Sequence, residues 1–85
     1  MGSTVNLNII TLNVRGIIAV LKRQKLFIWF KKQDADIVFI QETHCTKAKH
    51  GIFINDWNGL SLYSLTNSTF SRGVGILIKK TVVLK

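Results

Sequence analysis

The sequence predicts a single α/β domain over residues 1–85, and three successive patterns support this class. An alternating segment at 5–14 is typical of a strand, helical spacing follows at 18–32, and a short continuous apolar run follows at 37–40. A strand, a helix and a second strand in this order form a βαβ unit with parallel strands. Two further strands are expected at 57–64 and 73–83.

The first strand and the helix are each predicted from their periodicity. Polar and apolar residues alternate over 5–14 with one slip at Ile9-Ile10, and Gly16 ends the strand. Within the helix, Trp29 and Phe30 follow Leu26 at spacings of three and four, so a core position is favoured over a base-stacking role for the two aromatic residues. The cationic residues available for the solvent face are Lys22, Arg23, Lys25, Lys31 and Lys32.

In the second half of the chain, the sequence patterns that predict secondary structure are shorter. Residues 34–36 form a polar turn, and the apolar run at 37–40 is too short for a helix, so a buried parallel strand is predicted there. The basic segment 44–55 is expected to be a loop that can include a short helical turn. The polar stretch 66–69 suits a hairpin connection between the last two strands.

Composition excludes several classes of protein. The chain has 12 Lys+Arg against 4 Asp+Glu, a formal charge of +8, and 47% hydrophobic residues, which is too apolar for a disordered segment. No apolar run approaches the length needed to cross a bilayer, and no secretory signal is recognisable. A single cysteine, Cys45, excludes a disulfide framework and favours a reducing nuclear or cytoplasmic location. The positive charge favours an anionic partner such as nucleic acid, although a merely solvated surface explains it equally well.

Two polar residues follow the predicted parallel strands. Asn13 ends the first strand and Glu42 follows the second, and the carboxyl ends of parallel neighbours meet at one edge of a sheet, where α/β proteins usually bind ligands. A carboxylate there is suited to Mg²⁺, which takes oxygen ligands and is common at phosphate sites. The alternatives are a solvated or Lys-paired Glu42 and a turn-forming Asn13.

The same positions carry a family resemblance. Asn-x-x-Gly at 13–16, Gln41-Glu42-Thr43 after an apolar strand, and the segment 72–78 (RGVGILI) follow one another in order. This pattern, which covers essentially the whole chain, resembles the opening of the exonuclease–endonuclease–phosphatase superfamily. Within it, the chain is most similar to the endonuclease domain of LINE-type retrotransposons, relatives of the apurinic/apyrimidinic endonucleases.

The resemblance implies a Mg²⁺-dependent phosphodiesterase that acts on DNA and is built as a two-sheet, four-layer α/β sandwich. It implies that Glu42 binds the metal and that Asn13 belongs to the catalytic network around the scissile phosphate. Ala35 stands where the family usually has proline. The family's later elements, an Asp-x-Asn segment and an Asp-His pair, do not occur before Lys85, so we expect an N-terminal portion of a nuclease domain, inactive by itself and in need of the remainder to complete its fold.

Four cations are candidates for a nucleic-acid-binding surface: Arg15, Lys47, Lys49 and Arg72. Lys22 and Arg23 are weaker candidates, for which a solvated face is an equal alternative. A different class of function also fits this charge, namely a non-catalytic basic α/β module that binds nucleic acid, or a decayed retroelement remnant without a role. Binding that falls steeply with salt and needs no Mg²⁺ would favour the non-catalytic module.

Other candidate motifs are weaker. His44, Cys45 and His50 form a poor zinc site because the adjacent residues diverge and a fourth ligand is missing. Cys45 is more simply an apolar filler, and Gly73-Val74-Gly75 lacks the Gly-Lys of a phosphate loop and suits close strand packing. Trp57 fits either a core or a surface position.

Overall fold

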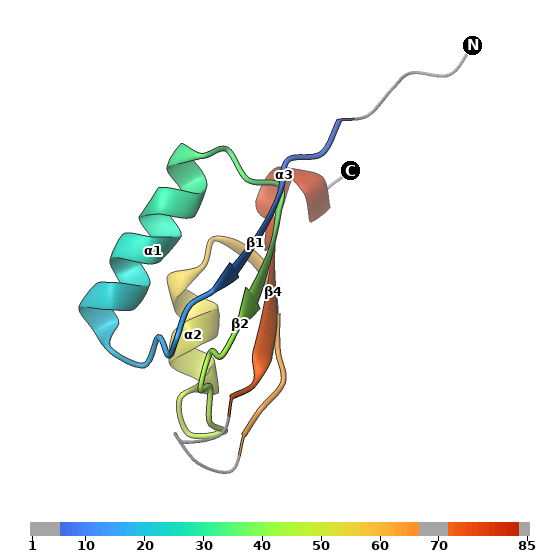
Figure 1. Cartoon of the computed structure of the whole chain (residues 1–85). Coiled ribbons are helices and arrows are strands. Elements are labelled where there is room, and N and C mark those ends of the chain that lie inside the picture. The colour runs from blue at the N-terminus through green and yellow to red at the C-terminus, as the bar shows by residue number, and fades with distance from the viewer. Residues whose placement is uncertain (1–5, 67–71, 84–85) are drawn as a thin grey trace.

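The computed structural model describes residues 6–66 and 72–83 and shows a layer of helices on a sheet (Figure 1). Its elements are β1 (Ile9–Asn13), α1 (Val20–Lys32), β2 (Ile37–Gln41), α2 (His50–Asp56), β3 (Gly59–Tyr63), β4 (Val74–Lys79) and α3 (Lys80–Val83). The α/β class is therefore confirmed, as is the predicted order of a βαβ unit followed by two strands.

The sheet is mixed, with strand order β1-β2-β4-β3. β1 and β2 are parallel, with Ile9 opposite Ile37 and Asn13 opposite Gln41. β4 pairs antiparallel with both β2 and β3. Helices α1 and α2 lie on the same side of this sheet (Figure 1). The described residues form this one sheet, and the predicted connection at 66–69 lies mostly outside them.

The core lies between the sheet and the two helices. The strands contribute Val38, Ile40 and Leu77, which are at most 1% exposed. Phe27 and Phe30 of α1 and Phe53 of α2 cover them, and the ring of Trp57 meets Phe27 edge to face, with centroids 5.6 Å apart. Trp57 is therefore a core residue, and its indole nitrogen donates to the carbonyl of Ile78. Cys45 is also fully buried, as expected for an apolar filler.

Two predictions for α1 were wrong. Its buried residues are Arg23, Phe27 and Phe30, which repeat at the i, i+4 and i+7 positions of one helix face. Trp29 precedes Phe30 by about 100° around the helix axis and is 44% exposed, so it is not in the core. Arg23, predicted to lie on the solvent face, is 1% exposed.

Burial of Arg23 is compensated by polar contacts. Its Nε donates to Asp56 Oδ2 at 2.6 Å, and Nη1 donates to the carbonyls of Ile17 and Ile18 at 2.9 Å. The guanidinium carbon also lies 4.8 Å from the centroid of the Phe53 ring. This ion pair joins the first turn of α1 to the end of α2.

In the second half of the chain, three predicted boundaries differ from those in the structure. The segment expected to be a loop contains α2, a full helix from His50, because Phe53 on it is buried in the core. β3 begins at Gly59 and not at Trp57. β4 ends at Lys79, since its neighbours begin at Ile37 and Gly59 and offer no partner beyond that point, and the chain continues as the short helix α3.

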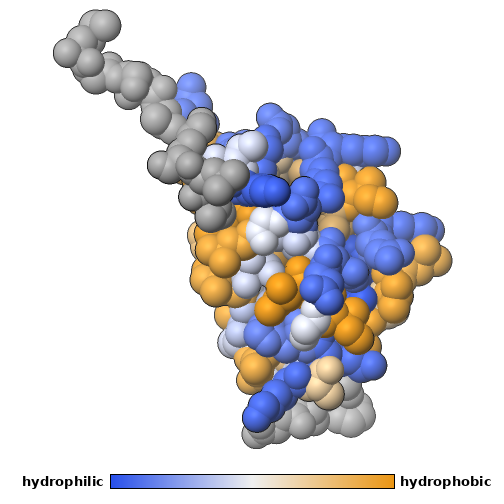
Figure 2. Space-filling view, turned by 180° about the vertical axis from the view of Figure 1, so that it is seen from behind, coloured by the Kyte–Doolittle hydropathy of each residue, from blue (hydrophilic) through white to orange (hydrophobic). Residues whose placement is uncertain are grey.

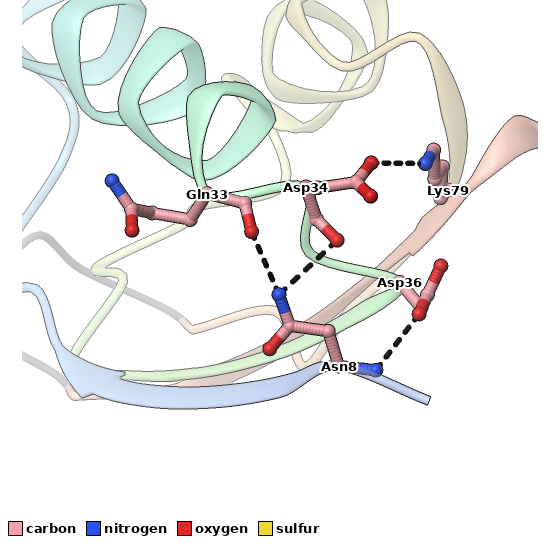
Figure 3. Close-up of polar contacts among 5 residues, drawn as sticks. All are labelled: Asn8, Gln33, Asp34, Asp36 and Lys79. Carbon is pink, nitrogen blue, oxygen red and sulfur yellow. Dashed lines mark hydrogen bonds and ion pairs between the residues drawn. The ribbon is translucent and has the colours of Figure 1, made fainter. Parts of the chain in front are cut away.

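The end of the sheet at which β1 and β2 begin is fastened by polar contacts (Figure 3). The Asn8 amide donates to the carbonyls of Gln33 and Asp34, and its backbone N–H donates to the Asp36 carboxylate at 2.8 Å. Lys79 forms an ion pair with Asp34. The predicted turn at 34–36 thus holds β1, β2 and β4 together. Among the described residues, none of the helices has the length and apolarity needed to span a bilayer.

Candidate metal and phosphate site at the carboxyl edge

Asn13 and Glu42 are in contact at the carboxyl edge of β1 and β2, as the sequence predicts. Asn13 is the last residue of β1 and lies opposite Gln41, the last residue of β2. Glu42 is the next residue after Gln41, so it lies at the same end of the sheet as Asn13. The Asn13 amide nitrogen donates to Glu42 Oε2, and Asn13 Oδ1 accepts the backbone N–H of Arg15 at 3.0 Å. The amide therefore links the carboxylate to the turn after β1.

The backbone around this pair is unusual. Three residues other than glycine, Arg15, Glu42 and His44, have φ between 51° and 58°. Such left-handed conformations cost on the order of 1 kcal/mol or more each and are concentrated at functional sites. Because Glu42 leaves the extended conformation directly after β2, its side chain departs from the strand alternation and reaches Asn13, whose side chain stands on the exposed face of β1.

Backbone hydrogen bonds join the turn after β1 to the turn after β2. The N–H of Gly16 donates to the carbonyl of Glu42, and the N–H of Ile17 donates to the carbonyl of Thr43 at 3.2 Å. Gly16 has φ +82°, and a Cβ on it would lie 2.9 Å from Nδ1 of His44, so only glycine leaves room for this imidazole. Asn-x-x-Gly at 13–16 thus has a local structural reason in this chain.

Thr43 connects the site to β4, a contact that sequence reasoning missed. Its side chain is fully buried, and its N–H donates to the carbonyl of Gly73 at 3.3 Å. The next N–H, of His44, donates to the carbonyl of Arg72 at 2.8 Å. These bonds bring Arg72 to the same edge as Glu42. The position of Thr43 directly after Gln41-Glu42 was the only signal in the sequence.

The chain has four carboxylates, and their partners differ. Asp34 and Asp56 are in ion pairs with Lys79 and Arg23. Asp36 accepts the backbone N–H of Asn8 at the opposite end of the sheet. Glu42, which is partly exposed, accepts the neutral amide of Asn13 and has no cationic partner within the part of the chain that the structure describes. Its charge is therefore available to an external cation.

These residues fit only part of a magnesium site. Over residues 6–66 and 72–83, no group of three or more His, Cys, Asp or Glu side chains comes together. Glu42 supplies one carboxylate, whereas Mg²⁺ in proteins usually takes one or two carboxylates together with waters and substrate phosphate. The described residues thus do not form a complete metal centre from side chains of these four types.

The four candidate DNA-binding cations belong to segments that meet at this edge. Arg15 follows β1, Lys47 and Lys49 lie between β2 and α2, and Arg72 precedes β4. All four are exposed, and the Lys22 ammonium donates to the carbonyl of Arg15 at 3.1 Å. Glu42 is thus accompanied at this end of the sheet by an excess of positive charge.

The three residues considered for a zinc site, His44, Cys45 and His50, do not come together in the structure. Cys45 is buried, His44 packs against Gly16, and the ring of His50 meets Tyr63 with centroids 6.1 Å apart. Burial raises the pKa of the Cys45 thiol above its ordinary value, and nearby Arg23 offsets this only in part, so the neutral thiol is favoured. Burial likewise raises the pKa of Tyr63. We find no zinc site among these described residues.

No known protein-family model matches the chain. Fold and geometry define a class: an α/β protein with an amide–carboxylate pair at the carboxyl edge of parallel strands and exposed cations around it.

Proposed function

We propose that this chain is the N-terminal portion of a Mg²⁺-dependent DNA endonuclease domain of the exonuclease–endonuclease–phosphatase type, related to LINE retrotransposons and catalytically incomplete by itself. The observation that carries the proposal is the contact between Asn13 and Glu42 at the carboxyl edge of two parallel strands. Glu42 is the one carboxylate at that edge, and Asn13 fixes its orientation.

The roles proposed for these residues follow from their chemistry. Glu42 would give a carboxylate oxygen to Mg²⁺ when the remaining ligands are present, and bound Mg²⁺ would neutralise charge on a phosphodiester. Asn13 holds Glu42 through its amide nitrogen, while its amide oxygen is fixed by the N–H of Arg15. Arg15 and Arg72, which reach the same edge, are proposed to contact DNA phosphates.

We further propose a two-sheet architecture for the complete domain and a nuclear or cytoplasmic location. In the complete domain, a second sheet would pack on the side of the present sheet opposite to α1 and α2, which gives the four-layer sandwich of the superfamily. The free Cys45 is in keeping with a reducing nuclear or cytoplasmic compartment.

Nicking of supercoiled plasmid DNA tests the catalytic part of the proposal. The purified chain in Mg²⁺ is expected to leave the plasmid intact, because the described residues supply only one carboxylate at the edge. A Glu42→Ala variant is the matched control for contaminating nucleases. Nicking by the wild-type chain that Glu42→Ala abolishes would contradict the proposed incompleteness, although it would support the assignment of Glu42.

A second candidate is a non-catalytic module that binds nucleic acid through the same surface. It is favoured by the four exposed cations near one end of the sheet. Both candidates predict DNA binding that weakens with salt, with a slope of about −0.9 per phosphate contacted. They differ in Mg²⁺: a metal-site remnant predicts that Mg²⁺ alters binding of the wild-type chain more than that of Glu42→Gln, whereas the module predicts equal responses.

A further inference from the structure

A groove lies between α1 and β1, the strand at one edge of the sheet (Figure 1). Its volume is about 570 Å³, within the range of roughly 300–1,000 Å³ that is usual for small-ligand sites. The residues that give this α1–β1 groove its chemistry are Leu12 and Asn13 of β1 and Lys22, Lys25, Leu26 and Trp29 of α1.

The contribution of α1 comes from one stripe of the helix. Its four residues follow one another at positions i, i+3, i+4 and i+7, so they share a face. Lys22, Leu26 and Trp29 each precede a buried residue of α1 by one position, which places this stripe beside the core. Trp29 is accordingly 44% exposed, while its indole meets the ring of Phe30 with centroids 5.6 Å apart. An aromatic ring held by the core thus borders the groove.

The charge of the groove favours an anionic occupant. Hydrophobic side chains also reach the surface on the side of the molecule seen in Figure 2, so an apolar lining alone does not identify a ligand. The α1–β1 groove differs in that two exposed lysines, Lys22 and Lys25, line it and no acidic residue is among its described lining residues. The Lys22 ammonium donates to the carbonyl of Arg15 at 3.1 Å, which places it near the turn after β1.

The groove is continuous with the candidate phosphate site. Asn13 belongs to both, since it lines the groove and its amide contacts Glu42. A DNA strand with one phosphate at the Glu42 edge can therefore place a neighbouring nucleotide in the groove. Proteins that bind single strands combine a positively charged groove with aromatic side chains on which bases stack.

A nucleotide uses the three features of the groove together. Its phosphate is attracted to the two lysines, its base can stack on Trp29 above the leucine side chains, and its strand continues to the Glu42 edge. The base must be unpaired, because in a duplex its faces are covered by neighbouring bases and it reaches a protein pocket only when it leaves the stack. An acidic peptide would satisfy the lysines alone.

We propose that the α1–β1 groove binds an unpaired nucleotide of a DNA strand whose neighbouring phosphate lies at the Glu42 edge, with its base stacked on Trp29. The inference rests on the proposed function, which places DNA at that edge. It identifies single-stranded or locally unpaired DNA as the preferred substrate class.

Titration with single-stranded oligothymidylate of about eight nucleotides tests the groove. Base stacking is expected to quench the fluorescence of Trp29, whereas Trp57, which is 5% exposed, should change little. In anisotropy measurements with labelled oligothymidylate, Trp29→Ala should bind at least about fivefold more weakly than the wild-type chain. Ile28→Ala, at a 52% exposed position of α1 outside the groove, is the matched control and should bind as the wild-type chain does.

Two further comparisons separate stacking from charge and from misfolding. An abasic oligomer with the same number of phosphates has no bases, so the wild-type chain and Trp29→Ala should bind it equally. Trp29→Phe keeps an aromatic ring, so it should retain most of the affinity for oligothymidylate and lose most of the quenching. If Trp29→Ala loses its circular dichroism signal, Trp29→Leu, which keeps apolar contacts without a stacking ring, replaces it.

Several results would overturn the proposal. They are failure of the folded wild-type chain to bind oligothymidylate, equal affinity of Trp29→Ala and the wild-type chain, an equal loss for Ile28→Ala or for the abasic oligomer, and equal dependence on Trp29 for a blunt duplex. Displacement of the oligonucleotide by an acidic peptide of the same charge, at the same concentration, would assign the groove to a protein partner instead.

The variant Arg15→Gln/Arg72→Gln distinguishes failure of the groove from failure of the proposed function. If this variant weakens DNA binding and Trp29→Ala does not, DNA lies at the Glu42 edge and the assignment of the groove is wrong. If Trp29→Ala weakens binding and the arginine variant does not, the groove binds DNA and the proposed DNA-facing role of the Glu42 edge is wrong.

Discussion

Arg23 shows how a single residue can decide the packing of two helices. Its guanidinium is buried between α1 and α2, where it bonds to Asp56 and to two backbone carbonyls. Removal of one partner from a buried ion pair leaves the other charge desolvated, which costs far more than the pair itself contributes. Among the described ion pairs this one is the more buried, since the Lys79 and Asp34 side chains are 36% and 81% exposed.

Arg23→Ala is expected to lower the free energy of unfolding by about 3–5 kcal/mol, a large part of the total of roughly 4–13 kcal/mol for a domain of this size. Lys25→Ala, at an exposed position on the same helix, should change it by less than about 0.5 kcal/mol. Urea unfolding of both variants at one protein concentration measures the difference. Equal unfolding midpoints would show that Arg23 does not anchor the helices.

The sequence allows the Asn13–Glu42 contact to be predicted but not the environment of Arg23. The parallel direction of β1 and β2 and the two-residue alternation of their side chains place Asn13 and Glu42 at one edge of the sheet. Both the strand direction and the alternation can be inferred from local sequence patterns. Arg23 stands among other cations in a helical segment, so its local pattern indicates a solvent face. Its buried position depends on Asp56, 33 residues further on, which no local periodicity connects to it.

α1 and β1 are predictable from their periodicity and β2 from its continuous apolar run, whereas α2 is not predictable in this way. α2 has seven residues, contains Gly51, and is preceded by Lys49, whose side chain makes no capping hydrogen bond to the first turn. Each of these features weakens a helix. Tertiary contacts of Phe53, which lies against Tyr63 and Arg23, overcome the weak local preference.

Gly51→Ala is expected to stabilise the chain by about 0.5–1 kcal/mol, because alanine favours the helix and a Cβ at this position meets no atom within 4 Å. Gly16→Ala should instead destabilise it, since φ is +82° and the added Cβ would lie 2.9 Å from His44 Nδ1. Thermal unfolding of both variants makes the comparison. A lower melting temperature for Gly51→Ala would indicate that this segment is the loop that its sequence suggests.

On the scale of the whole molecule, the two ends of the sheet have different roles. One end is fastened by Asn8 and the turn at 34–36, which uses two of the four carboxylates in structural contacts. The other end has the left-handed turns, Asn13 and Glu42, and the four cations proposed to face DNA. We propose that DNA binds at this second end.

Comparison of two double variants with the same loss of charge tests that claim most directly. Arg15→Gln/Arg72→Gln removes two cations at the Glu42 edge, and Lys31→Gln/Lys32→Gln removes two exposed cations from the last turn of α1. In a salt titration of binding to a short DNA duplex, we expect the Arg15/Arg72 variant to lose about tenfold in affinity and about two units of salt slope. The Lys31/Lys32 variant should bind nearly as the wild-type chain does. Equal losses for the two variants, or a greater loss for Lys31/Lys32, would contradict a DNA-binding surface at the Asn13–Glu42 edge.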